Sequence, residues 1–180
     1  EGYAIAKIAA LKLIETYNKE YKTNFVSLIS CNLYGVHERY DEIHSHVAPA
    51  LIIKIHKAKI ENEPFVKLWG TGTARREFVF AADIAGAALH FMTHDYPNLD
   101  YSYINIGPGQ EPVSIKELAE TICEVIGYNG EIKWDNSKPD GMPHKVLEVS
   151  RMKQCGFKPK VPLKKGLAMA YEYYLKAYKK

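Results

Sequence analysis

The chain has 180 residues, of which 47% are hydrophobic and 25% charged, the balance of a soluble globular protein large enough to bury a core. Its 24 Lys and Arg against 21 Asp and Glu leave a net charge of only +3 and no large basic field, so nucleic acid is not an expected partner. No apolar run approaches the roughly 20 residues that span a bilayer, so no membrane partner is expected. The three widely spaced cysteines argue against a disulfide framework or a zinc knuckle, and they favour a location in a reducing cytoplasm.

The first predicted element is a helix from about Gly2 to Glu20, marked by an apolar stripe with helical period. Apolar residues on its other sides predict either deep burial or packing against another subunit. Tyr3 and Lys7 lie one turn apart on one face, and an ammonium group beside a phenol favours the phenolate. The pair is a candidate for proton transfer, although many solvated helices carry the same spacing.

A buried strand is predicted next, at Phe25–Ser30, and a helix followed by such a strand indicates a parallel α/β sheet. Ligands of open α/β sheets bind beyond the carboxyl ends of strands, where the segment from Asn32 to Gly35 lies. The alternative for this segment is an ordinary turn. In the polar stretch from Val36 to His46, a single histidine serves better as a proton donor than as part of a metal site, because the acidic residues lack a familiar ligand spacing.

The rest of the chain alternates predicted helices and strands. Helices are expected at Val47–Lys59 and Leu163–Tyr178, and another is expected to follow an N-cap at Asp83. A further helix is expected to begin at the capping box formed by Ser114 and Glu117 and to end at Gly127. Strands are expected at Phe65–Trp69, Tyr103–Ile106 and Glu131–Trp134. Neither glycine-containing turn of this part is a phosphate loop. The segment from Gly70 to Thr73 lacks a third glycine and a following helix, and Pro108 makes the segment from Gly107 to Gly109 a turn.

Taken together, the motifs resemble an extended short-chain dehydrogenase/reductase of the NAD-dependent epimerase/dehydratase family. The residues that carry this resemblance are Tyr3-Ala4-Ile5-Ala6-Lys7, Asn32-Leu33-Tyr34-Gly35, Arg76-Glu77-Phe78-Val79 with Ala82-Asp83-Ile84-Ala85, and Asn105-Ile106-Gly107. Within the family, the chain is most similar to the enzymes that form GDP-L-fucose. That closer resemblance rests on Ser45-His46-Val47-Ala48-Pro49-Ala50-Leu51, Leu68-Trp69-Gly70-Thr71-Gly72-Thr73 and Ser137-Lys138-Pro139-Asp140-Gly141.

The resemblance implies an α/β fold, the C-terminal part of a Rossmann-type extended reductase with a smaller α+β substrate-binding domain. Residues 1–46 would belong to the dinucleotide-binding domain and residues 47–180 mainly to a nucleotide-sugar-binding domain, with about 78–107 returning to the Rossmann unit. The family's phosphate loop precedes its Tyr-x-x-x-Lys motif, so the chain is expected to be a fragment that lacks roughly 130 residues. Alone it is expected to be inactive and not to bind the cofactor normally, and tight, stoichiometric NADPH binding by the isolated chain would contradict the second expectation.

The resemblance also implies NADP as the cofactor, in its NADPH form for reduction, with NAD not excluded. Tyr3 would donate a proton to the alkoxide formed from a sugar 4-ketone, and Lys7 would lower the pKa of that tyrosine and bind the nicotinamide ribose. Asn32 and Leu33 match positions beside the nicotinamide half of the cofactor. His46 matches the acid that takes part in epimerising C3 and C5 of the sugar, and it is also expected to bind the cofactor. In the family, the second epimerising residue is a Cys upstream of the Tyr.

For the substrate, the resemblance implies a GDP-sugar whose diphosphate requires cations. Arg76 matches a diphosphate-binding Arg, and Lys54 stands where bacterial enzymes carry another Arg. Lys138 and Trp69 match further nucleotide-sugar contacts, with core packing as the alternative for Trp69. The remaining substrate-binding candidates are Val47, Leu51 and Gly70. Cys31 stands where the family often has Thr and is interpreted as a packing residue.

The implied activity is NADP-dependent epimerisation and 4-keto reduction of a GDP-4-keto-6-deoxy-hexose by a homodimer that pairs through the Tyr3–Lys7 helix. Two alternatives stay open. One is a reductase that does not epimerise and acts on a related GDP-4-keto-deoxy-sugar such as a heptose. The other is an incomplete, non-catalytic module that binds nucleotide sugars or serves in assembly.

Overall fold

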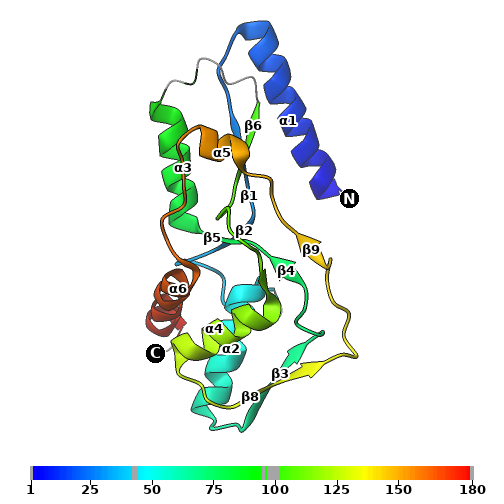
Figure 1. Ribbon diagram of the computed structural model, residues 1–180, viewed down its shortest axis with the longest axis vertical. Coiled ribbons are helices and arrows are strands. Elements are labelled where there is room, and N and C mark those ends of the chain that lie inside the picture. The colour runs from blue at the N-terminus through cyan, green and yellow to red at the C-terminus, as the bar shows by residue number, and fades with distance from the viewer. Residues whose placement is uncertain (1, 42–43, 95, 97–101, 179–180) are drawn as a thin grey trace.

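The computed structural model describes residues 2–41, 44–94, 96 and 102–178, which form an elongated α/β molecule (Figure 1). The helices are α1 (Gly2–Tyr21), α2 (Val47–Ile60), α3 (Ala81–Thr93), α4 (Ile115–Ile126), α5 (Ser150–Gln154) and α6 (Leu163–Tyr178). The strands are β1 (Ser27–Ser30), β2 (Asn32–Tyr34), β3 (Phe65–Trp69), β4 (Arg75–Arg76), β5 (Phe78–Phe80), β6 (Tyr103–Ile106), β7 (Val113–Ser114), β8 (Glu131–Asp135) and β9 (His144–Lys145).

Strands from distant parts of the sequence pair in parallel. β1 pairs with β6, β2 with β5 and β3 with β8, while β4 pairs in parallel with β9 and antiparallel with β7. Parallel strands need crossover connections, which the intervening helices supply. The predicted parallel α/β class is therefore confirmed.

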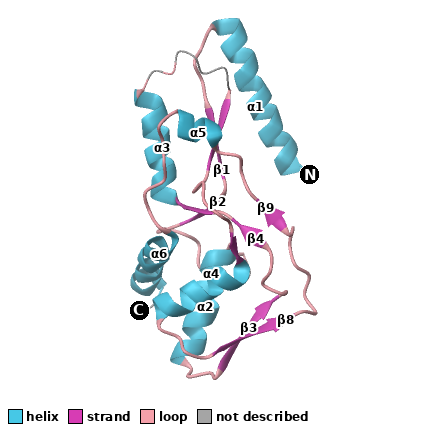
Figure 2. Ribbon diagram, viewed as in Figure 1, coloured by secondary structure: helices cyan, strands magenta, loops and turns pink. Residues whose placement is uncertain are grey.

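Two hydrophobic cores hold the molecule together. The main core gathers buried side chains from α2, α4 and α6, and Figure 2 shows these three helices grouped at the lower end, beside β3 and β8. A second core lies where α3 and α5 flank the β1–β6 pair. Its fully buried members include Ala87, Ile104, Ile106 and Met152, which α3, β6 and α5 contribute.

Helix α4 begins and ends where the sequence predicts. The hydroxyl of Ser114 accepts a hydrogen bond from the Glu117 N–H at 3.0 Å, and the Glu117 carboxylate accepts one from the Ser114 N–H at 2.6 Å. Gly127 ends the helix in the left-handed conformation, with φ of 71°, which glycine adopts without steric cost. The predicted capping box is confirmed.

The predicted N-cap at Asp83 is wrong. Helix α3 starts three residues earlier than predicted, at Ala81, with Phe80 as its N-cap. The Asp83 carboxylate instead accepts hydrogen bonds from the backbone N–H groups of Lys160 at 2.9 Å and Val161 at 3.0 Å. The side chain thus ties the start of α3 to the segment before α6, a distant contact that local sequence does not reveal.

The shortest elements also escaped prediction. β2, β4, β7 and β9 have two or three residues each and α5 has five, too few to display a hydrophobic period. The positions of these strands depend on pairing with strands far away in the sequence, and that of α5 on packing in the second core.

Helix α1 lies along one side of the molecule with none of its described residues buried (Figure 1). Ile5 is 66% exposed, Ile8 59% and Leu13 58%. Deep burial, one of the two predicted environments, is therefore wrong for this chain, and packing against another subunit stays a prediction. Within the described ranges, no helix is both long enough and apolar enough to cross a membrane.

We expect replacement of the cap residue, Ser114→Ala, to lower the free energy of unfolding by about 1 kcal/mol, because it leaves an N–H group at the start of α4 without its acceptor. Chemical denaturation measures this loss. Thr121→Ala is the matched control, since it removes a hydroxyl that bonds only the Glu117 carbonyl within the same helix, at a site where alanine favours the helix. Equal destabilisation by both variants would contradict the capping role.

Candidate functional site

The candidate site begins at the carboxyl ends of β3 and β8. The parallel register pairs Trp69 with Asp135, the last residue of each strand, so the two following loops leave the sheet at the same edge. Residues 70–74 form the first loop and residues 136–143 the second. Ligand-binding residues of α/β sheets gather at such an edge.

An exposed indole marks this edge. The Trp69 side chain is 66% exposed, so the alternative of core packing is wrong. Lys54 on α2 places its Nζ 4.7 Å from the centroid of the Trp69 ring, and Lys138 of the second loop places its Nζ at 5.7 Å. Both distances lie within the range of cation–π attraction. Three residues predicted to bind substrate thus form one group, which we call the Trp69 cluster.

Arg76 on β4 reaches the second loop. A Cβ at Gly141 would lie 3.2 Å from Arg76 Nη2, while Arg76 Nη1 donates to the Arg75 carbonyl at 2.7 Å. Throughout the described part of the chain, no carboxylate lies within salt-bridge distance of Lys54, Arg76 or Lys138. These cations are therefore available to an anionic ligand.

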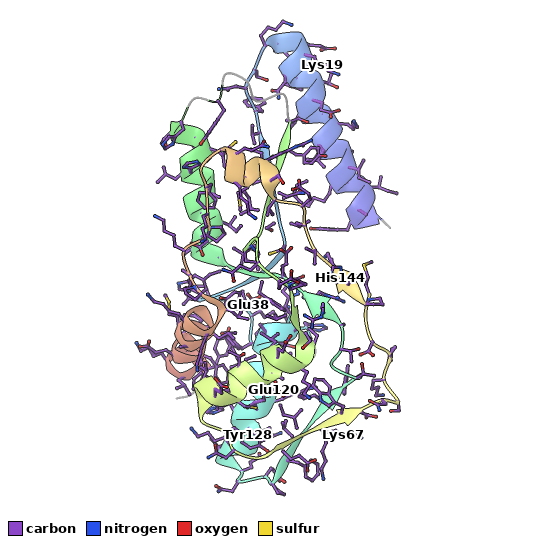
Figure 3. The ribbon with its side chains drawn as sticks, viewed as in Figure 1. Lys19, Glu38, Lys67, Glu120, Tyr128 and His144 are labelled. Carbon is purple, nitrogen blue, oxygen red and sulfur yellow. The ribbon has the colours of Figure 1, made fainter. Side chains whose placement is uncertain are left out.

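Two aspartates organise the second loop. Asp135 accepts hydrogen bonds from the Ser137 hydroxyl at 2.6 Å and pairs at 2.9 Å with Lys67, labelled in Figure 3. The Ser137 and Lys67 contacts lower the pKa of Asp135 to about 2. Asp140 accepts from the Thr71 N–H at 2.9 Å and the Thr71 hydroxyl at 2.7 Å, which lowers its pKa.

Sequence reasoning missed the roles of Asp140 and Thr71. A Pro-Asp-Gly segment is typical of a turn, and the local pattern does not disclose that the Asp side chain crosses to another loop. The only available signal was that both residues fall inside the motifs Ser137–Gly141 and Leu68–Thr73.

His46 stands at the N-cap position of α2 with an exposed side chain that makes no capping hydrogen bond. The hydroxyl of the preceding Ser45 accepts from the Asp41 N–H at 2.6 Å and donates to the Arg39 carbonyl at 2.8 Å, which ties Ser45 to these two residues. Two neighbouring candidates are less accessible: Val47 is partly buried, and Leu51 is only 6% exposed within the main core.

Tyr3 and Lys7 share one face of α1, as predicted. Lys7 Nζ lies 5.5 Å from the centroid of the Tyr3 ring, and Tyr3 is 78% exposed. In Figure 1 the helix starts near the middle of the molecule and runs away from β3 and β8. The structure therefore brings the pair together and keeps it apart from the Trp69 cluster.

The remaining cofactor candidates lie at β2. Asn32 Nδ2 donates to the Glu77 carbonyl at 2.9 Å, and Leu33 is 40% exposed, an arrangement that fits contact with a planar ring. The Glu77 carboxylate is buried and accepts the Leu147 N–H at 2.7 Å. Burial and the nearby Glu77 charge raise the pKa of Cys31 to about 12, so the thiol stays protonated at neutral pH, in agreement with its interpretation as a packing residue.

Comparison with known proteins identifies the family. The model of the NAD dependent epimerase/dehydratase family matches residues 1–107, more than half of the chain. The chain belongs to that family. Members share a Rossmann-like α/β fold, so the predicted fold class is confirmed.

Several family members are close in sequence. A GDP-L-fucose synthase of Escherichia coli (strain K12) is 44% identical over 183 residues, covering 97% of this chain and 56% of that protein. A probable GDP-L-fucose synthase 1 of Oryza sativa subsp. japonica is 44% identical over 175 residues, covering 97% and 52%. A solved GDP-mannoheptose C4 reductase from Campylobacter jejuni with NADP bound has a TM-score of 0.80 at 32% identity, covering 94% and 58%. The chain spans about half the length of the curated relatives it matches.

We expect protonation of Asp135 in acid to destabilise the second loop. Its pKa lies near 2 in the folded chain against an ordinary 3.8, so the carboxylate stabilises the fold above about pH 4, and this contribution disappears as the pH falls toward 2. In Asp135→Asn, the free energy of unfolding should therefore depend less steeply on pH across that interval. Ser137→Ala should also reduce the pH dependence of the free energy of unfolding in that interval. If the free energy of unfolding depends on pH equally in Asp135→Asn and wild type, Asp135 is not the responsible group.

Proposed function

We propose that this chain, joined to a complete dinucleotide-binding unit, carries out NADP-dependent epimerisation and 4-keto reduction of a GDP-4-keto-6-deoxy-hexose, the reaction type that forms GDP-L-fucose. The observation that carries the proposal is the Trp69 cluster, in which two lysines that have no carboxylate partner among the described residues lie against an exposed indole. The 44% identity to two GDP-L-fucose synthases supports the same substrate class.

Together with Arg76, the Trp69 cluster suits a nucleoside diphosphate. Lys54 and Lys138 supply two ammonium charges and Arg76 a planar guanidinium, the groups that pair best with phosphate oxygens. Trp69 offers an aromatic face to a base or sugar. Gly70 follows with a φ of 78°, which lets the chain turn directly behind the indole. Val47 and Leu51 would bound the site from α2, the latter from within the core.

Reduction of the ketone requires a proton at the developing alkoxide. We assign its delivery to the Tyr3 hydroxyl, with the Lys7 ammonium 5.5 Å from the ring centroid stabilising the resulting phenolate. Asn32 and Leu33 would hold the nicotinamide half of NADP, with NAD as the less favoured cofactor. The bound cofactor supplies the hydride, while the protein supplies orientation and the proton.

Epimerisation precedes reduction in this proposal. Carbons beside a ketone lose protons readily, so a base on one face and an acid on the other invert them. His46 is the proposed acid, because its side chain is exposed at the start of α2 and hydrogen bonds hold the adjacent Ser45 to Arg39 and Asp41. We also propose that His46 contacts the cofactor, as the family resemblance implies.

The proposal divides the chain by role. Residues 1–46 would belong to the dinucleotide-binding domain and 47–180 mainly to the nucleotide-sugar-binding domain, with about 78–107 returning to the first. The second core supports this return, because it joins α3 and β6 to β1. Cytoplasmic location is part of the proposal, supported by three free cysteine thiols.

A reductase without epimerase activity is the second candidate. The similarity to a solved GDP-mannoheptose C4 reductase favours it. The two candidates share the Tyr3 step and differ in whether His46 acts on carbon.

Solvent isotope incorporation separates the two functions in the complete protein. With GDP-4-keto-6-deoxy-mannose in deuterated water, we expect deuterium at C3 and C5 of the reduced product. Tyr3→Phe should slow reduction about 10²–10⁴-fold while exchange continues, and His46→Asn should slow exchange. A reduced product without deuterium would remove the epimerase function and leave the second candidate.

The exposed apolar side chains of α1 support a homodimer formed through the Tyr3–Lys7 helix. We expect the complete protein to sediment as a dimer, and Ile8→Asp, which places a charge in the proposed interface, to shift it toward monomer. Glu20→Lys is the control, since it changes the charge of an exposed residue at the far end of the same helix, about three turns from Ile8. A monomeric wild-type protein would contradict the interface.

A further inference from the structure

We propose that Asp140 is a positioning residue for nucleotide binding, through a contact with Thr71 that fixes Trp69 and Lys138 relative to each other. We call the two hydrogen bonds between Asp140 and Thr71 the loop latch. The inference rests on the proposed GDP-sugar site and adds a residue to it that itself does not touch the ligand.

The loop latch joins the two loops at the carboxyl ends of β3 and β8. Asp140 Oδ1 accepts the Thr71 backbone N–H at 2.9 Å, and Oδ2 accepts the Thr71 hydroxyl at 2.7 Å. The Thr71 hydroxyl also lies 2.7 Å from that of Thr73, within the same loop. One carboxylate therefore binds a backbone and a side-chain donor of the opposite loop.

Gly70 makes this approach possible. A Cβ at Gly70 would overlap the Asp140 Oδ1 atom, and the residue has a φ of 78°, which disfavours any side chain. The glycine between Trp69 and Thr71 thus lets Asp140 come close to the backbone directly behind the indole. The second loop is held at its other end as well, where Asp135 accepts from Ser137.

Lys138 consequently lies between two fixed points of its loop, and Trp69 lies two residues before Thr71. Fixing both side chains before the ligand arrives reduces the conformational entropy lost on binding. Without the latch, the nucleotide itself would have to fix the position of one loop relative to the other.

Electrostatics alone and a positioning role predict opposite effects of removing Asp140 on GDP affinity. Asp140 is an anion beside a site for a diphosphate, so Coulomb repulsion predicts that its removal raises GDP affinity. A positioning role predicts that removal lowers it. The sign of the change therefore discriminates between the two.

The test is calorimetric titration of the 180-residue chain with GDP. We expect Asp140→Ala to weaken GDP binding about tenfold, the cost of losing charge-assisted hydrogen bonds that hold the site, and Thr71→Val to weaken it less. The double variant should bind like Asp140→Ala, because both changes break one contact. Asp140→Asn, which keeps an acceptor for the Thr71 N–H, should restore most of the affinity. Glu131→Ala, which removes an exposed carboxylate from the other end of β8, is the control and should leave it unchanged.

The outcomes separate the latch from the site. GDP affinity that is unchanged or higher in Asp140→Ala overturns the latch alone, as do strictly additive effects of the two variants. If the wild-type chain binds no GDP, or Lys138→Met binds as tightly as wild type, the proposed site fails and the latch with it. Weakened binding by Asp140→Ala, without the proportional fall in unfolding midpoint that a purely structural loss would cause, supports the positioning role.

Discussion

The parallel pairing of β3 with β8 is the constraint on which the candidate site depends. The two strands are far apart in sequence, and their register ends both at the same edge, at Trp69 and Asp135. A shift of one residue would turn every side chain of the strand to the opposite face. Lys138 could then no longer reach the Trp69 indole, and Asp140 could no longer reach Thr71. Burial of Val66 and Leu68 on the inner face of β3 holds that register.

Around this edge the chain separates two kinds of chemistry. The cations that suit a diphosphate come from α2, which packs in the main core, from β4, and from the loop after β8, a strand whose Trp134 packs against that core. The proton-transfer pair lies on α1, which contributes no buried side chain. A rigid scaffold thus supports the part of the site that would hold the ligand, whereas the helix carrying Tyr3 has its apolar surface uncovered. This asymmetry agrees with a chain that spans about half the length of its curated relatives.

Much of the fold could be predicted because its signals are local. The capping box of Ser114 with Glu117 and the terminating Gly127 mark α4 within a few residues, and the hydrophobic periods of α2 and α6 are long enough to detect. The Trp69 cluster was predicted as separate residues through resemblance to a family, and its assembly into one group required the structure. Asp83 failed as an N-cap because its carboxylate bonds to backbone 77 and 78 residues away. Asp140 escaped notice for the same reason, since a turn residue that crosses to Thr71 looks like any other turn residue.

A crystal structure of the chain with GDP tests the central claim most directly. The diphosphate should lie against Lys54, Lys138 and Arg76, at the roughly 2.7–2.9 Å of charge-assisted hydrogen bonds, with Trp69 in contact with the nucleotide. GDP bound elsewhere, or bound with these side chains turned away from its phosphates, would contradict the assignment of this edge as the nucleotide-sugar site.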